Sequence, residues 1–303
     1  MEFKGLYTAL ITPFTIEGSL DIPGLRYLIQ NQLDHQVQGI VIAGSTGESA
    51  TLTMEEKIKM VEVAVEEAKG KAAVIMGTGS YSTAQTIAMT QTAQELGADA
   101  ALLITPYYNK PTQEGLYRHF AAVCESVSIP LYLYNNPGRT GQNLEPATLK
   151  RLSLFPSIKG IKECSGNMTQ MGEFFADSKE NRSFSIMAGD DGFALPLIAM
   201  GAKGLISSVS NLFPSQMKSL VDSCLAGDFE QARQLHYQLL PLFKAMSLET
   251  NPIPIKTALQ ICGMPAGPCR LPLCEMAPHR IEQLQQTISL SLGIYGQTKP
   301  SCC

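Results

Sequence analysis

One pattern recurs along the chain: a short run of β-branched and apolar residues, a turn containing Gly, Pro or Asn, and a longer stretch of helical periodicity. In one such stretch Ile58, Val61 and Val65 recur every three or four positions, which is typical of the buried face of a helix. Strands that alternate with helices form parallel sheets, and eight such units are typical of a closed barrel. The sequence therefore predicts an α/β fold, a TIM (β/α)8 barrel, with strands at residues 6–13, 39–44, 73–79, 100–106, 130–135, 158–164, 185–190 and 204–210.

The strand pattern ends near residue 225. Beyond it only helical periodicity remains, and no flexible linker precedes it. We expect a barrel over residues 1–225 and a helical C-terminal appendage over 226–303, with helices at 228–246, 254–262 and 276–292. Helix starts are indicated by Thr53 with Glu56 three residues later, a capping box, and by Ser82 and Thr112.

Composition excludes several classes of function. The chain of 303 residues has a net charge of -4 and no block of basic residues, so it lacks the electrostatic footprint of a protein that binds nucleic acid or an anionic membrane. We find no leader pattern and no apolar run of about twenty residues, and therefore expect a cytoplasmic protein that acts on small molecules.

The cysteines and histidines give no sign of a metal site or of another cofactor. Eight cysteines occur without a CxxC pair, and the four histidines are widely separated. A chain of this length with ample core residues is an improbable disulfide framework. We expect no metal and no cofactor, and we interpret the terminal Cys302 and Cys303 as two free thiols on a frayed tail.

Lys162 is the first candidate catalytic residue. It stands near the apolar end of the predicted strand 158–164, where the loss of water disfavours the ammonium form and favours the free, nucleophilic amine. Such an amine can form an imine with a ketone. Alternation along the strand places Gly160 on the same face, and we expect the glycine to leave room for the lysine side chain. The alternative is a structural lysine whose amine reaches solvent from the strand end, an interpretation that suits Lys159 at the strand's start.

Polar residues gather where the predicted strands end, the edge at which TIM barrels carry their active sites. Ser45 and Thr46 stand between two glycines and offer hydroxyl groups and backbone N–H groups to a carboxylate. The alternative is a loop whose glycines are needed only because its backbone adopts positive φ. Tyr134 has a phenol that can relay protons near an imine, or it is an ordinary core tyrosine with a hydrogen-bonded hydroxyl. Arg139 can bind a carboxylate through two parallel hydrogen bonds, or it is simply solvated.

Four motifs resemble one known family. Gly-Ser-Thr-Gly-Glu, Pro-Tyr-Tyr-Asn-Lys-Pro, Tyr-Asn-Asn-Pro-Gly-Arg-Thr and Gly-Ile-Lys-Glu-Cys-Ser-Gly-Asn occur in the order found in the pyruvate-dependent class I aldolases, the family of dihydrodipicolinate synthase and N-acetylneuraminate lyase. The motifs that contain Tyr108 and Arg139 resemble the synthase branch, which condenses pyruvate with L-aspartate 4-semialdehyde on the route to diaminopimelate and lysine. The resemblance extends over essentially the whole chain.

The resemblance implies a set of catalytic residues. By position, Lys162 forms the Schiff base with pyruvate, and Tyr134, Ser45 and Tyr108 relay protons. In family members the tyrosine at the position of Tyr108 reaches into the site of a neighbouring subunit. The resemblance therefore also implies an obligate dimer, usually a homotetramer built as a dimer of dimers.

The resemblance further implies the residues that bind substrate. Thr46 corresponds to the residue that binds the pyruvate carboxylate, and Arg139 to the one that binds the carboxylate of the semialdehyde. The loops at Gly189 and Ile206 correspond to those that line the pyruvate pocket.

Two positions depart from the usual synthase pattern. Ser45 stands where synthases usually have Thr and lyases have Ser, and we expect a slower proton relay rather than a different reaction. Synthases that lysine inhibits resemble one another in polar and acidic groups near the positions of Met54, Lys57, Tyr81 and Gln85. Here that set contains a lysine and no carboxylate, so we expect weak or absent inhibition by lysine.

Two other functions stay open at this point. One is a different pyruvate-dependent aldolase, such as N-acetylneuraminate lyase or a sugar-acid aldolase or dehydratase. Arg139 argues against it, because a polyhydroxylated substrate needs hydrogen-bonding side chains more than a fixed cation. The other is a barrel that has lost catalysis and serves as a sensor or scaffold, against which the presence of Lys162, Tyr134 and Arg139 argues.

Overall fold

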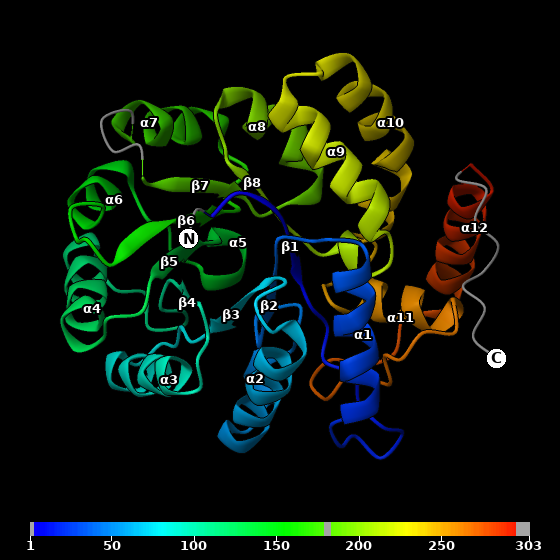
Figure 1. Ribbon diagram of the computed structural model, residues 1–303, viewed down its shortest axis with the longest axis horizontal. Coiled ribbons are helices and arrows are strands. Elements are labelled where there is room, and N and C mark those ends of the chain that lie inside the picture. Colours follow the sequence, from blue (N-terminus) through cyan, green and yellow to red (C-terminus); the bar gives the residue numbers. More distant parts are fainter. Residues whose placement is uncertain (1–2, 179–182, 295–303) are drawn as a thin grey trace.

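The computed structural model describes residues 3–178 and 183–294, and its centre is a closed barrel of eight parallel strands (Figure 1). The strands lie in chain order around the barrel, and β8 pairs with β1 to close it. The predicted eight-stranded barrel is therefore confirmed. The strands are β1 (Gly5–Ala9), β2 (Gly39–Ile42), β3 (Ala73–Gly77), β4 (Ala100–Ile104), β5 (Leu131–Asn135), β6 (Ile158–Glu163), β7 (Ser185–Ala188) and β8 (Gly204–Ser207).

Most strands end before the predicted range does. The apolar run beginning at residue 6 was expected to stay extended to residue 13, yet β1 ends at Ala9. Residues 10–13 enter the loop after β1 at the carboxyl edge of the barrel, where they remain buried although they lie outside the ladder pairs of β1 with β2. Burial rather than strand geometry therefore explains why these residues are apolar.

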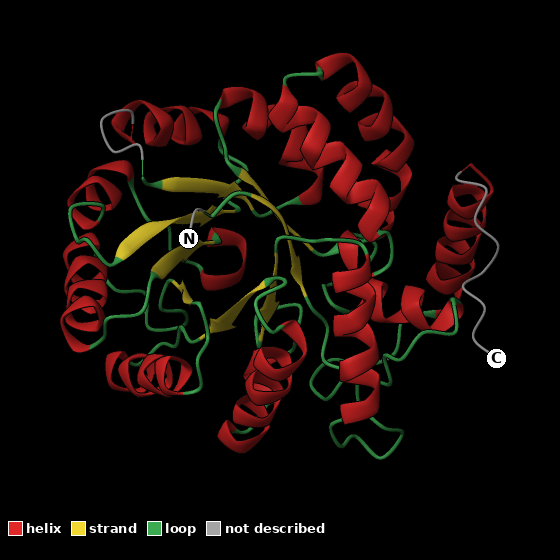
Figure 2. Cartoon of the chain, viewed as in Figure 1, coloured by secondary structure: helices red, strands yellow, loops and turns green. Residues whose placement is uncertain are grey.

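Helices surround the barrel, as Figure 2 shows in red around the yellow strands. Three predicted helix starts are confirmed, since the side chains of Thr53, Ser82 and Thr112 each accept a hydrogen bond from the backbone N–H three residues later. Thr53 and Glu56 form the predicted capping box. The helices beside the strands are α1 (Ile22–Asp34), α2 (Met54–Ala68), α3 (Thr83–Glu95), α4 (Gln113–Ser126), α5 (Pro137–Thr140), α6 (Pro146–Leu152), α7 (Met168–Ser178), α8 (Ala194–Met200) and α9 (Pro214–Ala226), with short 3-10 turns η1 (Ser49–Thr51), η2 (Asp191–Phe193) and η3 (Val209–Asn211).

Three more helices follow: α10 (Phe229–Ala245), α11 (Ile253–Ile261) and α12 (Pro278–Ile294). Their bounds agree with the predicted helices to within two residues. In Figure 1 they lie beside α9 and α1, outside the ring of strands, and α12 packs against α10 and α11. The division of the chain at residues 225 and 226 stays a prediction.

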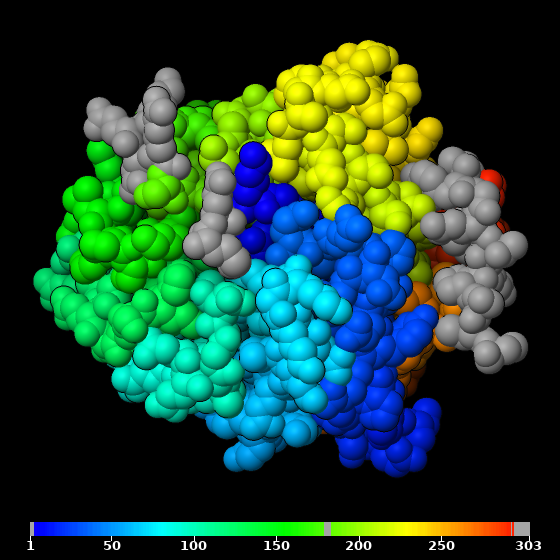
Figure 3. Space-filling model, viewed as in Figure 1, coloured from blue at the N-terminus to red at the C-terminus, as the bar shows by residue number. Residues whose placement is uncertain are grey.

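Aromatic rings fill the amino-terminal end of the barrel interior. Phe3 stacks against Tyr7 and Tyr132, with ring centroids 4.2 and 3.8 Å apart, and all three side chains are buried. Burial raises the pKa of Tyr7 to about 12. In the space-filling view the start of the chain, in dark blue, lies near the middle of the face, surrounded by later segments (Figure 3). The inward-facing residues thus form a packed core at this end, which leaves the carboxyl end for polar side chains.

The described residues include no helix that is long and apolar enough to cross a membrane. In the same part of the chain no group of three or more His, Cys, Asp or Glu side chains is arranged to hold a metal ion. Cys302 and Cys303 lie outside the described residues.

Candidate active site

Lys162 and Tyr134 lie side by side at the carboxyl end of the barrel. They are direct register partners on β6 and β5, and the residues paired with Lys162 on its two sides, Tyr134 and Met187, belong to the cluster that fills the barrel interior. The Lys162 side chain is buried, with 7% of its surface exposed, and its Nζ lies 4.4 Å from the centre of the Tyr134 ring. The barrel therefore holds an amine and a phenol next to one another, away from bulk water.

A glycine makes room for Lys162, but it is not the one predicted. A Cβ atom on Gly160 would collide with the backbone of Ser185 on β7, so Gly160 permits close strand pairing rather than space for the lysine. A Cβ atom on Gly189 would instead lie 2.8 Å from Cε and 2.9 Å from Cγ of Lys162. The prediction for Gly160 was wrong because alternation along one strand says nothing about what the adjacent strand contributes.

Asn136 orients the phenol of Tyr134. Its Nδ2 donates a hydrogen bond of 3.0 Å to the Tyr134 hydroxyl oxygen, and its Oδ1 accepts one of 3.1 Å from the Arg139 backbone N–H at the start of α5. Because the phenol oxygen accepts this bond, its own proton remains available for another partner. Burial raises the pKa of Tyr134, and the positive charge of Lys162 only partly offsets this effect. The phenol is thus kept protonated, as a proton donor beside the amine.

Cys164 is a third group beside Lys162 and Tyr134, and sequence analysis did not single it out. It follows β6 and packs with the interior residues. Burial raises the pKa of its thiol to about 12, although Lys162 and a hydrogen bond with Tyr134 act in the opposite direction. A thiol with so high a pKa is a poor nucleophile at neutral pH, so the Lys162 amine is the better candidate nucleophile of the two.

The loop at residues 44–48 carries the two predicted hydroxyl groups. Thr46 is buried, and its Oγ1 lies 3.0 Å from the Ser208 hydroxyl and accepts a hydrogen bond of 2.9 Å from Asn251 Nδ2. Ser45 is half-buried. Within the described part of the chain the structure records no hydrogen bond between the hydroxyl groups of Ser45 and Tyr134, so the predicted relay between them stays a prediction.

Arg139 lies on the exposed rim of the site, on α5. Its Nη2 donates a hydrogen bond of 3.0 Å to the backbone oxygen of Asn251. Ile206 is fully buried on β8 and belongs to the same interior cluster as Tyr134. The residues predicted to bind substrate therefore lie on the same end of the barrel as Lys162, with Arg139 towards solvent and Ile206 inside.

Tyr108, another predicted catalytic residue, lies at the surface of this chain. Its side chain is 91% exposed, whereas Tyr134 is 5% exposed, so the two phenols are not packed together within one chain. Its backbone has a φ of 73°, in the left-handed region that residues other than glycine seldom adopt. The loop thus holds a large aromatic ring outward at the surface.

Glu163 ties the ends of β5 and β6 together on the outer face of the barrel. Its buried carboxylate accepts hydrogen bonds of 3.1 Å from Asn135 Nδ2 and 2.6 Å from the Ser165 backbone N–H. Burial raises the pKa of this carboxyl group, and the two donors oppose the shift. Because Glu163 follows Lys162 directly, this network fixes the strand end from which the amine projects.

Comparison with known proteins identifies the family of the chain. The model of the dihydrodipicolinate synthetase family matches residues 2–291. This chain belongs to that family. It is similar to the 4-hydroxy-tetrahydrodipicolinate synthase of Protochlamydia amoebophila, with 53% identity over 95% of this chain and 97% of the other, and to that of Methanocaldococcus jannaschii, with 47% identity over 96% and 99%. The structure of dihydrodipicolinate synthase from Aquifex aeolicus is also similar, with a TM-score of 0.94, 43% identity, and coverage of 99% of this chain and 100% of that one.

These family relatives decide between the open alternatives. The predicted resemblance is confirmed, and the relatives carry the names of synthases rather than of sialic-acid lyases. A sensor or scaffold is disfavoured, since the chain is similar to named enzymes over nearly its whole length and keeps the lysine and the phenol in contact.

Besides Cys164, sequence analysis missed two asparagines of the site. Asn136 stood inside a motif directly after the predicted strand, and its place two residues from Tyr134 was a usable signal. Asn251 gave no such signal, because it contacts Thr46 from 205 positions along the chain.

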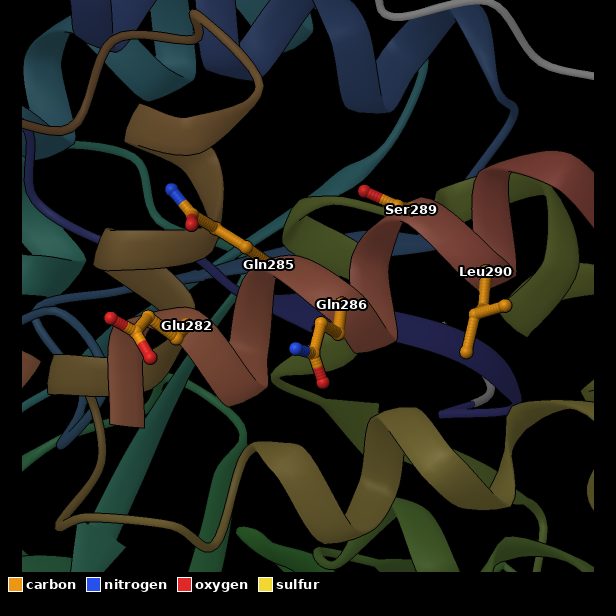
Figure 4. Close-up of a pocket in the computed structure, with 5 residues that line it drawn as sticks. All are labelled: Glu282, Gln285, Gln286, Ser289 and Leu290. Atoms are coloured by element: carbon orange, nitrogen blue, oxygen red, sulfur yellow. The ribbon is translucent and has the colours of Figure 1, made fainter. Parts of the chain in front are cut away.

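A groove elsewhere on the surface has no comparable chemistry. It has a volume of about 630 Å³ and runs along α12, as Figure 4 shows. Its lining residues include neither a lysine nor a tyrosine; they are Glu282, Gln285, Gln286, Ser289 and Leu290. A smaller cavity of about 100 Å³ is lined by Glu163 and Cys164, among other residues.

Proposed function

We propose that this chain is a Schiff-base-forming lyase that condenses pyruvate with L-aspartate 4-semialdehyde to give 4-hydroxy-tetrahydrodipicolinate, in the diaminopimelate route to lysine. The observation that carries the proposal is the buried amine of Lys162, 4.4 Å from the centre of the Tyr134 ring at the carboxyl end of the barrel. The names of the relatives give the product by analogy, and the second substrate is the one that the resemblance to the synthase branch implies.

The first half of the reaction joins Lys162 to pyruvate. The Thr46 hydroxyl and nearby backbone N–H groups bind the carboxylate of pyruvate, which brings its ketone to the amine. The Lys162 nitrogen attacks the carbonyl carbon, and the oxygen takes up a proton to give a carbinolamine. Tyr134, kept protonated by burial, donates the proton with which that hydroxyl leaves as water. The product is an imine between Lys162 and pyruvate.

The second half uses the nucleophilic methyl-derived carbon of the enamine that the imine forms. The Tyr134 phenolate left by the first half takes up a methyl proton to give an enamine. The enamine carbon adds to the aldehyde carbon of the semialdehyde, and the aldehyde oxygen takes that proton back from Tyr134 to become a hydroxyl, while Arg139 binds the substrate's carboxylate. The amino group of the added part then attacks the imine carbon, closes the ring and displaces the Lys162 amine. One water molecule is released over the whole reaction, in the imine-forming step.

We further propose that the active form is a homo-oligomer, a tetramer built as a dimer of dimers. The support is Tyr108, whose ring is 91% exposed and held in the left-handed backbone region. In the proposed dimer its phenol enters the neighbouring site and relays protons together with Ser45. A mixture of Lys162→Ala and Tyr108→Phe chains, each nearly inactive alone, should then recover activity, because one site of each hybrid dimer has both groups intact.

Borohydride trapping tests the proposed function. Incubation with pyruvate and borohydride should attach a reduced pyruvyl group to Lys162, located by mass spectrometry of peptides. Lys162→Ala should abolish both trapping and turnover. Lys159→Ala is the matched control at the start of the same strand and should be trapped normally. Trapping at another lysine, or none in the wild type, would contradict the proposal.

The choice of acceptor is tested separately. Product formation from pyruvate with L-aspartate 4-semialdehyde should far exceed that with N-acetylmannosamine, and the reverse result would favour the lyase branch. We also propose a cytoplasmic location, on the grounds that both substrates are small metabolites and that the named relatives are biosynthetic enzymes.

A further inference from the structure

Asn251, in the connection between α10 and α11, contacts both residues to which we assign a substrate carboxylate. Its side-chain Nδ2 donates to Thr46 Oγ1 at 2.9 Å, and its backbone oxygen accepts from Arg139 Nη2 at 3.0 Å. We propose that Asn251 is a positioning residue for both substrate half-sites, a role that rests on the proposed function. Its side chain orients the hydroxyl that binds pyruvate, and its main chain holds the guanidinium that binds the semialdehyde.

The donor and acceptor roles around Thr46 explain what the amide accomplishes. A threonine hydroxyl has one proton to donate and two lone pairs that accept. Asn251 Nδ2 can only donate, so it occupies one lone pair of Thr46 Oγ1. The Ser208 hydroxyl, 3.0 Å away, can donate to the other lone pair. With both lone pairs occupied, the Thr46 proton is left to point at an acceptor, which a carboxylate supplies.

The position of Asn251 is itself fixed by contacts that cross from the C-terminal helices to the barrel. Lys256, on the first turns of α11, is buried and donates to Glu48 Oε1 at 2.7 Å and to the backbone oxygen of Thr12 at 3.0 Å. The second oxygen of Glu48 accepts from the Arg270 backbone N–H at 2.9 Å. Glu48 belongs to the loop that carries Thr46, so the asparagine and the threonine are held in register by a buried ion pair.

The two contacts of Asn251 can be separated by mutation. Asn251→Ala removes the amide but keeps the backbone oxygen that binds Arg139. It should therefore raise the half-saturating pyruvate concentration roughly two- to tenfold, the effect of one neutral hydrogen bond. The KM for the semialdehyde should change less than about twofold, because the contact with Arg139 remains. Arg139→Ala should produce the opposite pattern.

Asn251→Asp tests whether donation is what matters. The substitution preserves shape but replaces the donor by a charged acceptor, which competes for the Thr46 proton and repels the carboxylate of pyruvate. The half-saturating pyruvate concentration should rise roughly tenfold or more. An aspartate variant that binds pyruvate as well as the wild type would overturn the inference, because an acceptor would then suffice.

A double-mutant cycle separates positioning from general damage to the fold. Thr46→Val removes the hydroxyl that the amide orients, so Asn251→Ala in that background should change pyruvate half-saturation by less than about twofold. Additive effects would overturn the inference. Gln260→Ala is the matched control: it removes another amide hydrogen bond of the C-terminal segment, to the Gly267 backbone oxygen at 2.9 Å, and should leave both half-saturation values unchanged.

Pyruvate half-saturation is measured by borohydride trapping of the full-length chain, which needs no second substrate. If the wild type is trapped at Lys162 but Asn251→Ala and Asn251→Asp bind pyruvate normally, the inference fails while the proposed function stands. If the wild type is not trapped at all, the proposed function fails and the inference falls with it. Should Asn251→Ala not fold, the aspartate variant alone decides between these outcomes.

Discussion

The buried ion pair between Lys256 and Glu48 makes a strong prediction for stability. The side chains of the two residues are 2% and 1% exposed, and Lys256 Nζ also donates to the backbone oxygens of Thr12 and Pro268. Burial lowers the pKa of Lys256, and the Glu48 carboxylate opposes the shift. Lys256→Met keeps a long unbranched side chain but leaves a buried carboxylate without its cationic partner and two backbone acceptors without their donor.

The magnitude follows from this burial. Removing one partner of a buried ion pair costs about 3–5 kcal/mol of unfolding free energy, since the remaining charge is uncompensated. An unfolding entropy of about 2.1 cal/mol/K per residue gives roughly 0.6 kcal/mol/K for the 303 residues of the chain. The melting temperature of Lys256→Met should therefore fall by about 5–8 °C.

Thermal unfolding followed by circular dichroism, at one fixed protein concentration, measures this shift. Lys59→Met is the matched control, because its ion pair with Glu62 is exposed and should contribute less than about 1 °C. Adding Glu48→Gln to Lys256→Met removes the unpaired charge and should restore part of the loss. A fall no larger than that of the control, or no recovery in the double variant, would refute the reasoning.

Four further predictions concern activity and pH. Tyr134→Phe should lower kcat by ~10²–10⁴-fold with little change in the circular dichroism spectrum, because it removes a proton donor and no packing. Arg139→Ala should raise the KM for the semialdehyde in steady-state assays while trapping with pyruvate persists; if trapping also failed, the role of Arg139 would be wrong. Lysine should inhibit weakly or not at all, because Lys57 would repel it, and half-inhibition at or below about 1 mM would overturn that expectation. Burial raises the pKa of Asp191 from 3.8 to about 6, so the folded state binds this proton more tightly than the unfolded state does. In urea titrations the free energy of unfolding should therefore fall, relative to that of Asp191→Asn, as the pH rises from about 4 to about 6. A difference between the two proteins that stays constant over this range would contradict the shift.

Local periodicity was sufficient to predict the fold. Strand and helix types follow from repeats of two and of three to four residues, which each segment contains by itself. The capping box at Thr53 and Glu56 shows the same point, because both partners lie within one turn. Strand ends were less predictable: the residues after Ala9 are buried in a loop, and burial makes a loop look like a strand.

The candidate site was predictable only in part. Lys162 stands out because a lysine at a buried strand end is unusual within its own segment, whereas Tyr134 was singled out because its strand ends at the predicted site. Their contact depends on the register between β5 and β6, which the two segments do not specify separately. The error over Gly160 has the same origin, since the atoms that a glycine must accommodate come from the adjacent strand.

The sequence by itself thus determined the order of the elements and the barrel they form, and it singled out Lys162 as the candidate amine, because each of these depends on patterns of residues close together in the chain. Tertiary structure alone decided that Asn251 meets Thr46 and Arg139, and that Lys256 meets Glu48, across 205, 112 and 208 positions. These contacts arise only when the C-terminal helices pack beside the completed barrel. Their partners are selected by three-dimensional position and burial, which a one-dimensional pattern does not record.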